Sequence, residues 1–240
     1  MDWRWAAGWR QTITAGLILL LLAALVSPVS AVDLSGSKGE ALRRNHQVGV
    51  RLGVWSNSGQ LPKASDSVGS YWYIADVKDA SFYAEVYLGI RVMRPLMLEL
   101  SAGMTNRGDV TVRNDLYDYY GNISLYPINV RLKLYPFAGT RSPYQPYLMG
   151  GGGLHIGKNN IQFSNDYYAA YNERSLTDLD FVFGGGLDWP LSTKVALDLQ
   201  AAYLPMKFSK ELFGAHDYSG VIITVGVKYL LPTLRGKTHK

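Results

Sequence analysis

The sequence contains no cysteine and few charged residues, and its apolar N-terminal run is too short to cross a membrane comfortably as a helix. The missing cysteines exclude a disulfide scaffold and a cysteine-ligated metal, although they leave the redox compartment open. Charged residues make up 18% of the chain, below the roughly 25% of ordinary soluble domains. An apolar fraction of 48% excludes disorder. No shift in composition divides the 240 residues, so we expect one folded domain.

The N-terminus has the layout of a secretory signal peptide. Arg4 and Arg10 precede the apolar run Leu17–Val26, and small residues stand at positions 29–31. A spanning helix needs about 20 apolar residues, which disfavours the alternative of an uncleaved anchor. We therefore predict a signal peptide over residues 1–31, cleaved after Ala31.

The mature chain is only mildly basic. Cleavage removes two arginines and Asp2, which changes the formal charge from +5 to +4. This balance does not indicate a nucleic-acid partner. Residues 32–45 form a polar lead-in, loose or briefly helical, which we expect in the periplasm.

Apolar and polar residues alternate in eight later segments, as they do in strands with one apolar face. The final segment carries Val221, Ile223, Val225 and Val227 on one face, and we expect it to pair with the first segment and close a sheet. The alternation changes parity beside Pro127, which predicts a β-bulge there. The predicted strands are Gln47–Val54, Phe82–Val92, Leu96–Met104, Ile123–Leu134, Leu148–Ile156, Asp178–Asp188, Val195–Tyr203 and Tyr218–Leu231.

The connections between these strands alternate in length. Long loops are expected over residues 56–78, 106–121, 158–177 and 206–217, and short turns over 93–95, 138–146 and 190–193. This asymmetry is typical of outer-membrane barrels, which have short periplasmic turns and longer outer loops. The predicted fold is all-β, an eight-stranded antiparallel up-and-down transmembrane β-barrel over residues 46–231, followed by a polar tail over 232–240.

The charged residues of the strands all fall opposite the apolar face. A charge on the lipid face costs roughly 2–4 kcal/mol near mid-membrane, so a bilayer enforces this sorting. A soluble barrel with its polar side outward would sort charges equally well, but the loop pattern and signal peptide favour the membrane. Five basic and six acidic residues nearly cancel, which predicts ion pairs in the lumen. These residues are Arg51, Glu85, Arg91, Glu99, Arg131, Lys133, Asp178, Asp180, Asp188, Asp198 and Lys228.

Thr224, Gly226, Tyr229 and Leu231 resemble the C-terminal signal that insertion machinery reads in bacterial outer-membrane barrels. The eight strands and the segments at 145–152 and 183–191 resemble the OmpA and OmpW type of small barrel. The resemblance implies the outer membrane of a Gram-negative-type bacterium, with contacts to its lipid and lipopolysaccharide. It also implies insertion by the barrel-assembly machinery with periplasmic chaperones, and a monomer.

The interior of an eight-stranded barrel is just wide enough for side chains to fill it. We therefore expect a non-enzymatic envelope protein with a filled lumen and with outer loops for structural or surface-interaction roles. The OmpW resemblance implies an alternative, a narrow channel for small apolar molecules. A lipid A-modifying enzyme is a further alternative, but the His-x-Ser triplet of lipid A deacylases is missing, since Ile156 and Gly157 follow His155. No catalytic residue, cofactor or metal is expected.

Glycines gather in two strands, at Gly150, Gly151, Gly152 and Gly153 and at Gly184, Gly185 and Gly186. If the loop between the strands centres between Tyr167 and Tyr168, Gly150 lies opposite Gly185. The inward members would then leave room for Tyr83 or Tyr87 from across the lumen, and the outward members a shallow notch in the lipid face. A sharply bent wall would use glycine equally well.

The same register sets His155 opposite Asp180, with both side chains inward. A carboxylate beside an imidazole favours its charged form, so we expect a pH-sensitive pair, either a latch or a simple lumen salt bridge. Arg107, Gly108 and Asp109 form a tripeptide known from adhesion proteins, here in an expected loop, but so short a string occurs by chance.

Overall fold

A computed structural model describes residues 36–59, 66–68, 71–113, 118–140, 142, 144–165, 168–212 and 215–231 of the protein. One short helix, α2, covers Gly36–Arg44. The strands are β1 (His46–Asn57), β2 (Asp66–Val68), β3 (Tyr71–Val77), β4 (Ala80–Met93), β5 (Leu96–Arg113), β6 (Asp118–Leu134), β7 (Gln145–Asn165), β8 (Tyr168–Pro190), β9 (Val195–Leu204), β10 (Lys207–Leu212), β11 (Ala215–Asp217) and β12 (Gly220–Leu231).

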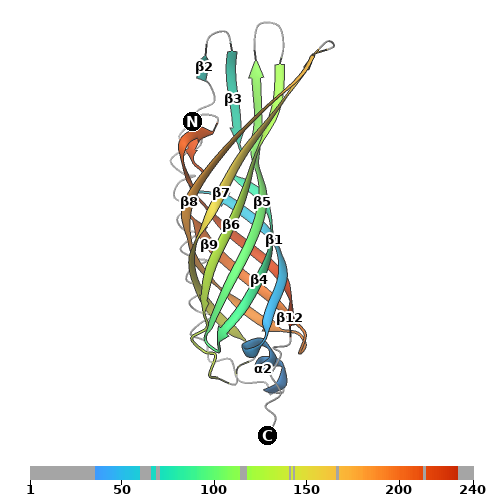
Figure 1. Ribbon diagram of the computed structural model, residues 1–240, viewed down its shortest axis with the longest axis vertical. Coiled ribbons are helices and arrows are strands. Elements are labelled where there is room, and N and C mark those ends of the chain that lie inside the picture. The colour runs from blue at the N-terminus through green and yellow to red at the C-terminus, as the bar shows by residue number, and fades with distance from the viewer. Residues whose placement is uncertain are drawn as a thin grey trace, which may run out of the picture. The chain divides into compact units, whose positions relative to one another are not determined.

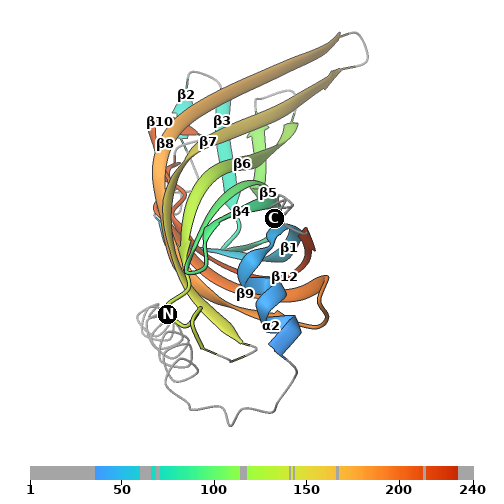
Figure 2. The same ribbon diagram turned by 60° about the horizontal axis from the view of Figure 1, so that its bottom comes forward.

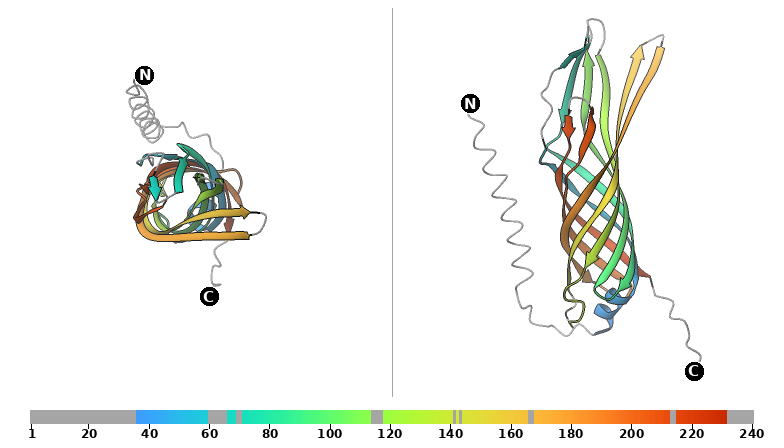
Figure 3. Two further views of the ribbon diagram at one scale, coloured as in Figure 1. Left: turned by 90° about the horizontal axis from the view of Figure 1, so that it is seen from above. Right: turned by 60° about the vertical axis from the view of Figure 1, so that its left-hand side comes forward.

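Eight of these strands close into a barrel, in the order β1, β4, β5, β6, β7, β8, β9, β12 (Figure 1). Every neighbouring pair is antiparallel, and β12 returns to pair with β1, with Val50 opposite Val227. The ring is visible when the protein is seen from above (Figure 3, left). The predicted closed, eight-stranded antiparallel barrel is confirmed.

The two faces of the barrel wall have opposite character. Apolar side chains cover the outside, with Val50 51% and Phe181 76% exposed, whereas Arg51 and Glu99 inside are fully buried. A soluble barrel would show the reverse arrangement, because water outside favours polar groups there. Lipid around the wall explains why the sequence alternates so regularly. Within the described residues, no helix has the length and apolar character needed to cross a membrane.

Several segments predicted as loops are strands. β5 and β6 pair as far as Arg113 opposite Asp118, and β7 and β8 as far as Asn165 opposite Tyr168. β3 adds to β5 above the barrel, with β2 beside it, and β10 and β11 form a small separate hairpin. In Figure 2 the β7–β8 hairpin continues well beyond the ring. Alternation failed to reveal these extensions because lipid does not demand an apolar face there.

The predicted bulge at Pro127 is wrong. Pairing of β6 with β7 runs through this residue without a shift, with Pro127 opposite His155. Ile123 and Leu125 instead point into the lumen and are fully buried, so the apolar set changes sides because the upper lumen is itself apolar. The shift in this part of the wall lies on β5, between Asn106 and Gly108.

Helix α2 packs at the end of the barrel where β1 begins. Its Leu42 is fully buried against Ala196 and Leu230. Arg91 of β4 donates from Nη2 to the Leu42 carbonyl oxygen at 2.8 Å, which ties the helix end to the wall. The expected lead-in thus contains a helix that covers part of this opening.

Candidate functional site

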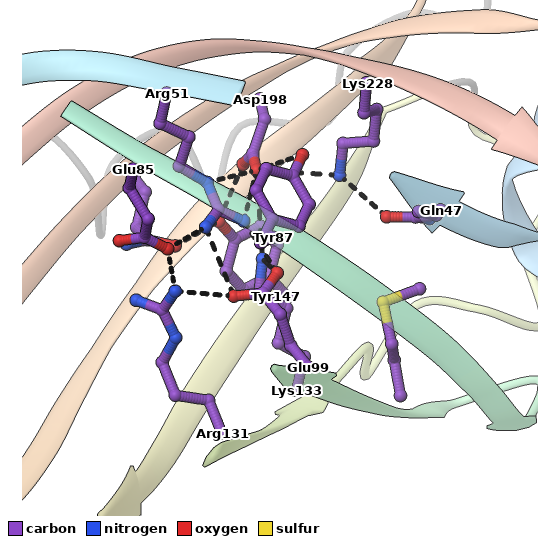
Figure 4. Close-up of polar contacts among 12 residues, drawn as sticks. Gln47, Arg51, Glu85, Tyr87, Glu99, Arg131, Lys133, Tyr147, Asp198 and Lys228 are labelled. Atoms are coloured by element: carbon purple, nitrogen blue, oxygen red, sulfur yellow. Dashed lines mark hydrogen bonds and ion pairs between the residues drawn. The ribbon is translucent and has the colours of Figure 1, made fainter. Parts of the chain in front are cut away.

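Eight charged side chains meet in the lower half of the lumen, and we call them the lumen network; Figure 4 labels all of them except Asp188. Each stands at an inward position of its strand, between lipid-facing neighbours. Seven of the eight barrel strands contribute. The members are Arg51, Glu85, Glu99, Arg131, Lys133, Asp188, Asp198 and Lys228.

Arg51 of β1 lies at the centre and uses all three guanidinium nitrogens. Nη1 donates to Glu85 at 2.7 Å, Nη2 to Glu99 at 2.7 Å and Nε to Asp198 at 2.7 Å. These acids come from β4, β5 and β9, so one side chain joins four strands. Charge-assisted bonds of this kind are the strong class of hydrogen bond.

The other three cations complete the charge balance. Arg131 bonds Glu85 and lies 2.9 Å from Glu99, while Lys133 Nζ is 2.7 Å from Glu99. Lys228 Nζ lies 2.6 Å from Asp188 Oδ1 and donates to Gln47 at 3.0 Å. Four cations face four carboxylates, so the network carries no net charge and offers no selectivity for ions of either sign.

Tyrosines fill the space around the network. Tyr83 donates to Glu85 at 2.7 Å, Tyr147 to Asp198 at 2.7 Å and Tyr135 to Asp188 at 2.9 Å. The guanidinium of Arg51 also stacks on Tyr87, with Cζ 3.6 Å from the ring centroid. Sequence reasoning placed Tyr83 and Tyr87 inside but missed Tyr135 and Tyr147, which lie at or beyond the ends of the predicted strands.

The tyrosines pack on glycines of neighbouring strands rather than across the lumen. A Cβ on Gly186 would lie 2.5 Å from the Tyr147 hydroxyl, one on Gly49 2.6 Å from the Tyr87 hydroxyl, and one on Gly103 2.7 Å from Tyr83 Cζ. An aromatic side chain covering a cross-strand glycine is a known stabilising device in sheets. The expectation that Tyr83 or Tyr87 fills the space over Gly151 or Gly184 is therefore wrong.

The predicted register of the two glycine strands is also wrong, by two residues. Gly185 lies opposite Leu148, and Gly151 opposite Val182. The β7–β8 hairpin turns one residue earlier in the chain than expected. A shift of the turn by one residue changes the cross-strand partner of every residue in the hairpin by two positions. Inward glycines still have a purpose, because a Cβ on Gly151 or Gly184 would overlap a backbone carbonyl of the next strand, whereas one on Gly150 would meet nothing within 4 Å.

Four predicted lumen residues do not join the network. Arg91 reaches down to α2, and the carboxylates of Asp178 and Asp180 accept backbone N–H groups of β10 at 2.6 and 3.1 Å. His155 lies opposite Asp178 rather than Asp180, yet its Nδ1 remains 3.5 Å from Asp180 and its Nε2 is 3.2 Å from Asn129. The imidazole is fully buried, which disfavours its charged form and opposes the carboxylate. The expected preference for the charged form is therefore not supported.

At the lower rim, Glu40 of α2 pairs with Arg43, Arg44 and Arg94. Partial burial lowers the pKa of Arg43 from its ordinary value, and Glu40 opposes that shift. Guanidinium pKa values are high enough that Arg43 stays charged at neutral pH. The contacts hold the helix on the wall without providing titratable chemistry.

Above the network an apolar cluster packs in the lumen beside a few buried polar side chains. Buried side chains from several strands gather there, among them Trp55, Ile123, Leu125, Leu204, Phe208 and Ile222. Arg107 also points inward and is fully buried, which removes it from any exposed adhesion tripeptide. Among the residues whose placement is described, no three His, Asp or Glu side chains are grouped to hold a metal ion.

The comparisons with known proteins agree with this geometry. The family model of the outer membrane protein beta-barrel domain matches residues 17–230. The chain belongs to this family. It is an outer-membrane barrel of the Gram-negative cell envelope, in contact with the lipid of that membrane.

Solved structures resemble this outer-membrane barrel at low sequence identity. OprG from Pseudomonas aeruginosa is 18% identical, covers 79% of this chain and 97% of its own, and gives a TM-score of 0.52. Neisserial surface protein A is 15% identical over 77% of this chain and 96% of its own, with a TM-score of 0.49. Ail of Yersinia pestis, in complex with the heparin analogue sucrose octasulfate, is 15% identical over 78% and 99%, with a TM-score of 0.46. The OprG likeness shows the fold alone, and comparison with curated proteins finds no match.

Proposed function

We propose that the protein is a non-enzymatic barrel whose lumen conducts no ions and whose extended hairpins serve structural or surface-interaction roles outside the cell. The lumen network carries this proposal. Its eight charges satisfy one another, and Tyr87, Tyr135 and Tyr147 occupy the space between them. Opening a water path would separate buried ion pairs, which is strongly unfavourable when one partner is left uncompensated.

Recording in planar lipid bilayers tests the closed lumen. The purified barrel should insert without conductance steps at voltages where a general porin, the positive control, gives clear steps. Opening events of uniform size in the wild type, lost in a preparation without the barrel, would contradict the proposal.

The absence of an enzymatic role is supported by the surroundings of His155. Its ring nitrogens face Asn129 and Asp180, and no serine hydroxyl contacts them among the described residues. Mass spectrometry of lipid A from cells with and without the protein should show the same acyl chains. A change in acylation that depends on His155 would overturn this part of the proposal.

The apolar upper lumen supports a second candidate, a narrow path for small apolar molecules. Ile123, Leu125 and Leu204 pack inside the barrel above the network. Because the network below them closes the lumen, an apolar molecule that entered here would have to leave sideways through the barrel wall. Cells that produce the wild type should then take up a small apolar dye faster than cells that produce Leu125→Glu. Equal uptake, with equal amounts of both proteins in the membrane, would remove this candidate.

We also propose the maturation suggested by the sequence. The signal peptide is cleaved after Ala31, α2 lies on the periplasmic side, the tail over residues 232–240 follows the barrel, and the mature protein is a monomer that contacts lipopolysaccharide. Barrel-assembly machinery and periplasmic chaperones deliver β12, whose Tyr229 side chain is exposed to lipid and whose Thr224 and Gly226 face inward. Intact-mass measurement of the purified protein should give a chain beginning at Val32.

A further inference from the structure

Arg107 differs from the other two arginines that are fully buried among the described residues. Arg51 and Arg131 each contact at least two carboxylates of the lumen network. Arg107 is equally buried, but no ion pair to it is formed by the described residues; Tyr218 and, less strongly, Asp79 act on it electrostatically. An unpaired buried charge is expensive, so its retention calls for a physical reason.

The side chain is held in place from one side. Arg107 Nη1 donates to the Trp55 carbonyl oxygen at 2.8 Å and to Ser81 Oγ at 3.3 Å. Its guanidinium lies over the Trp55 ring, with Cζ 5.3 Å from the centroid. Arg107 continues the inward series of β5 that includes Glu99, Ser101 and Thr105, and the register shift between Asn106 and Gly108 falls at this residue.

The opposite edge of the guanidinium, Nε and Nη2, is buried and forms no hydrogen bond with any residue whose placement is described. These two nitrogens point their N–H bonds in parallel, which is the geometry that binds the two oxygens of a carboxylate.

Two further buried donors without a hydrogen-bond partner among the described residues belong to β1, whose Trp55 ring the guanidinium covers. Trp55 Nε1 is buried and has no hydrogen-bond partner in the part of the chain that the structure describes. The indole fits here because residue 220 is glycine, since a Cβ at that position would overlap Nε1. Asn57 lies two residues along the same face of β1, and its buried Nδ2 has no partner among the described residues. Its Oδ1 already accepts a hydrogen bond from the Gly59 N–H, so only the donor of this side chain is free. The unpartnered atoms of Arg107, Trp55 and Asn57 are therefore all donors.

A cluster of donors alone is poorly matched to water. A water molecule accepts bonds from such groups but must also donate its own hydrogens, and buried waters typically make about three bonds. A carboxylate accepts through two oxygens, donates nothing and neutralises the guanidinium. We propose that Arg107, Trp55 Nε1 and Asn57 Nδ2 form a binding site for a small carboxylate in the upper lumen.

The ligand would arrive from the end that carries the extended hairpins. Asn57 and Ser81 each retain 6% exposure, whereas Trp55 and Arg107 retain none. The apolar cluster around Trp55 and Ile123 favours a carboxylate with a small apolar body over a polar one. The site lies above the lumen network, so occupancy does not require a conducting path.

Acetate is the probe for the test. Protein with ¹⁵N-labelled indole groups, in lipid nanodiscs, is titrated with sodium acetate and, at matched ionic strength, with sodium chloride. The Trp55 indole resonance, assigned with Trp55→Phe, should shift saturably with acetate and far less with chloride. The shift should vanish in Arg107→Met, weaken several-fold in Asn57→Leu and persist in Arg94→Met, which alters an exposed arginine at the other end.

Thermal unfolding gives a second test that does not depend on the indole resonance. Acetate should raise the unfolding temperature of the wild type and leave that of Arg107→Met unchanged. Without any carboxylate, Arg107→Met should be at least as stable as the wild type, because methionine removes an uncompensated charge. The site is refuted if acetate and chloride act alike on Trp55, or if Arg107→Met is markedly less stable in carboxylate-free buffer.

Discussion

At the scale of single residues, the barrel interior is governed by compensation of charge. Arg51 satisfies three carboxylates from three other strands, and each acid has further cations or tyrosine hydroxyls within bonding distance. A buried ion pair adds little to stability over an apolar pair of the same shape. Removal of one partner is nevertheless strongly destabilising, because it leaves the other charge buried without compensation. Single substitutions in the lumen network should therefore be far more harmful than their solvent-exposed counterparts.

Arg51→Met tests this expectation directly. It leaves Glu85, Glu99 and Asp198 short of a cation, and the free energy of unfolding should fall by about 3–5 kcal/mol. Urea unfolding in lipid vesicles, followed by tryptophan fluorescence, measures the loss. Arg94→Met is the control, because Arg94 is 58% exposed and should give little change. Equal midpoints for the two variants would show that the network does not support the fold.

Two glycines on adjacent strands offer a second, matched test. Gly186→Ala places a methyl group against the backbone carbonyl oxygen of Leu199 and the Tyr147 hydroxyl, and overpacking of this kind typically costs about 1–3 kcal/mol. Gly150→Ala adds the same methyl group where no atom lies within 4 Å. Thermal unfolding in the same detergent should show a lower midpoint for Gly186→Ala alone. If Gly150→Ala is equally destabilising, strand propensity rather than tyrosine packing determines the effect.

The sequence predicted all eight members of the lumen network, because lipid forces every charge in a spanning strand inward. It did not predict the partners, since these depend on register. The glycine register was wrong by two residues because the point at which the β7–β8 hairpin turns leaves no mark on the alternation. Arg107 was missed because the predicted loop began at residue 106, whereas β5 and its inward alternation continue through Arg107.

At the scale of elements, the lower halves of the strands were predictable and the upper halves were not. Apolar alternation marks β4 from Phe82 to Val92, where lipid meets the wall, and it fades in β7 beyond Ile156. Above the membrane, water on both sides imposes no period, and strand pairing alone holds the hairpins. Ile123 and Leu125 belong to neither pattern, because they pack in an apolar part of the lumen that no alternation predicts.

Helix α2 depends on one apolar anchor. Leu42→Ala should weaken its attachment by about 2–5 kcal/mol, the usual cost of truncating a buried leucine. The chain has no cysteine, so Ala41→Cys supplies a single thiol for labelling rates. The double variant with Leu42→Ala should react with a water-soluble maleimide much faster than Ala41→Cys alone. Identical rates would mean that Leu42 does not fix the helix to the barrel.

At the scale of the whole molecule, the orientation follows from the two unlike ends of the barrel. The turns between β4 and β5 and between β8 and β9 are short, whereas β5 to β8 extend into long hairpins at the other end. Outer-membrane barrels keep their short turns in the periplasm. The extended hairpins should therefore face the outside of the cell.

Single cysteines test this orientation in intact cells. Ser175→Cys, exposed on β8 above the ring, should react with a membrane-impermeant maleimide. Thr193→Cys, exposed in the short turn before β9, should react only after the outer membrane is permeabilised. Labelling of Thr193→Cys in untreated cells, together with protection of Ser175→Cys, would require the opposite orientation.

The β1–β12 seam joins the two ends of the barrel sequence, and charges meet across it. The Arg51 guanidinium on β1 binds the Asp198 carboxylate on β9, and the Lys228 ammonium on β12 donates to the neutral amide of Gln47 on β1, so charged groups depend on partners across the seam. A sheet that has not yet closed therefore exposes formal charge at the edges that must enter lipid. We therefore expect insertion to be all-or-none. Closure of the seam completes the backbone hydrogen bonds of the sheet and, in the same step, gives each lumen charge its partner. A barrel that lacks one strand would be unstable in the bilayer, because its unpaired charges would face lipid.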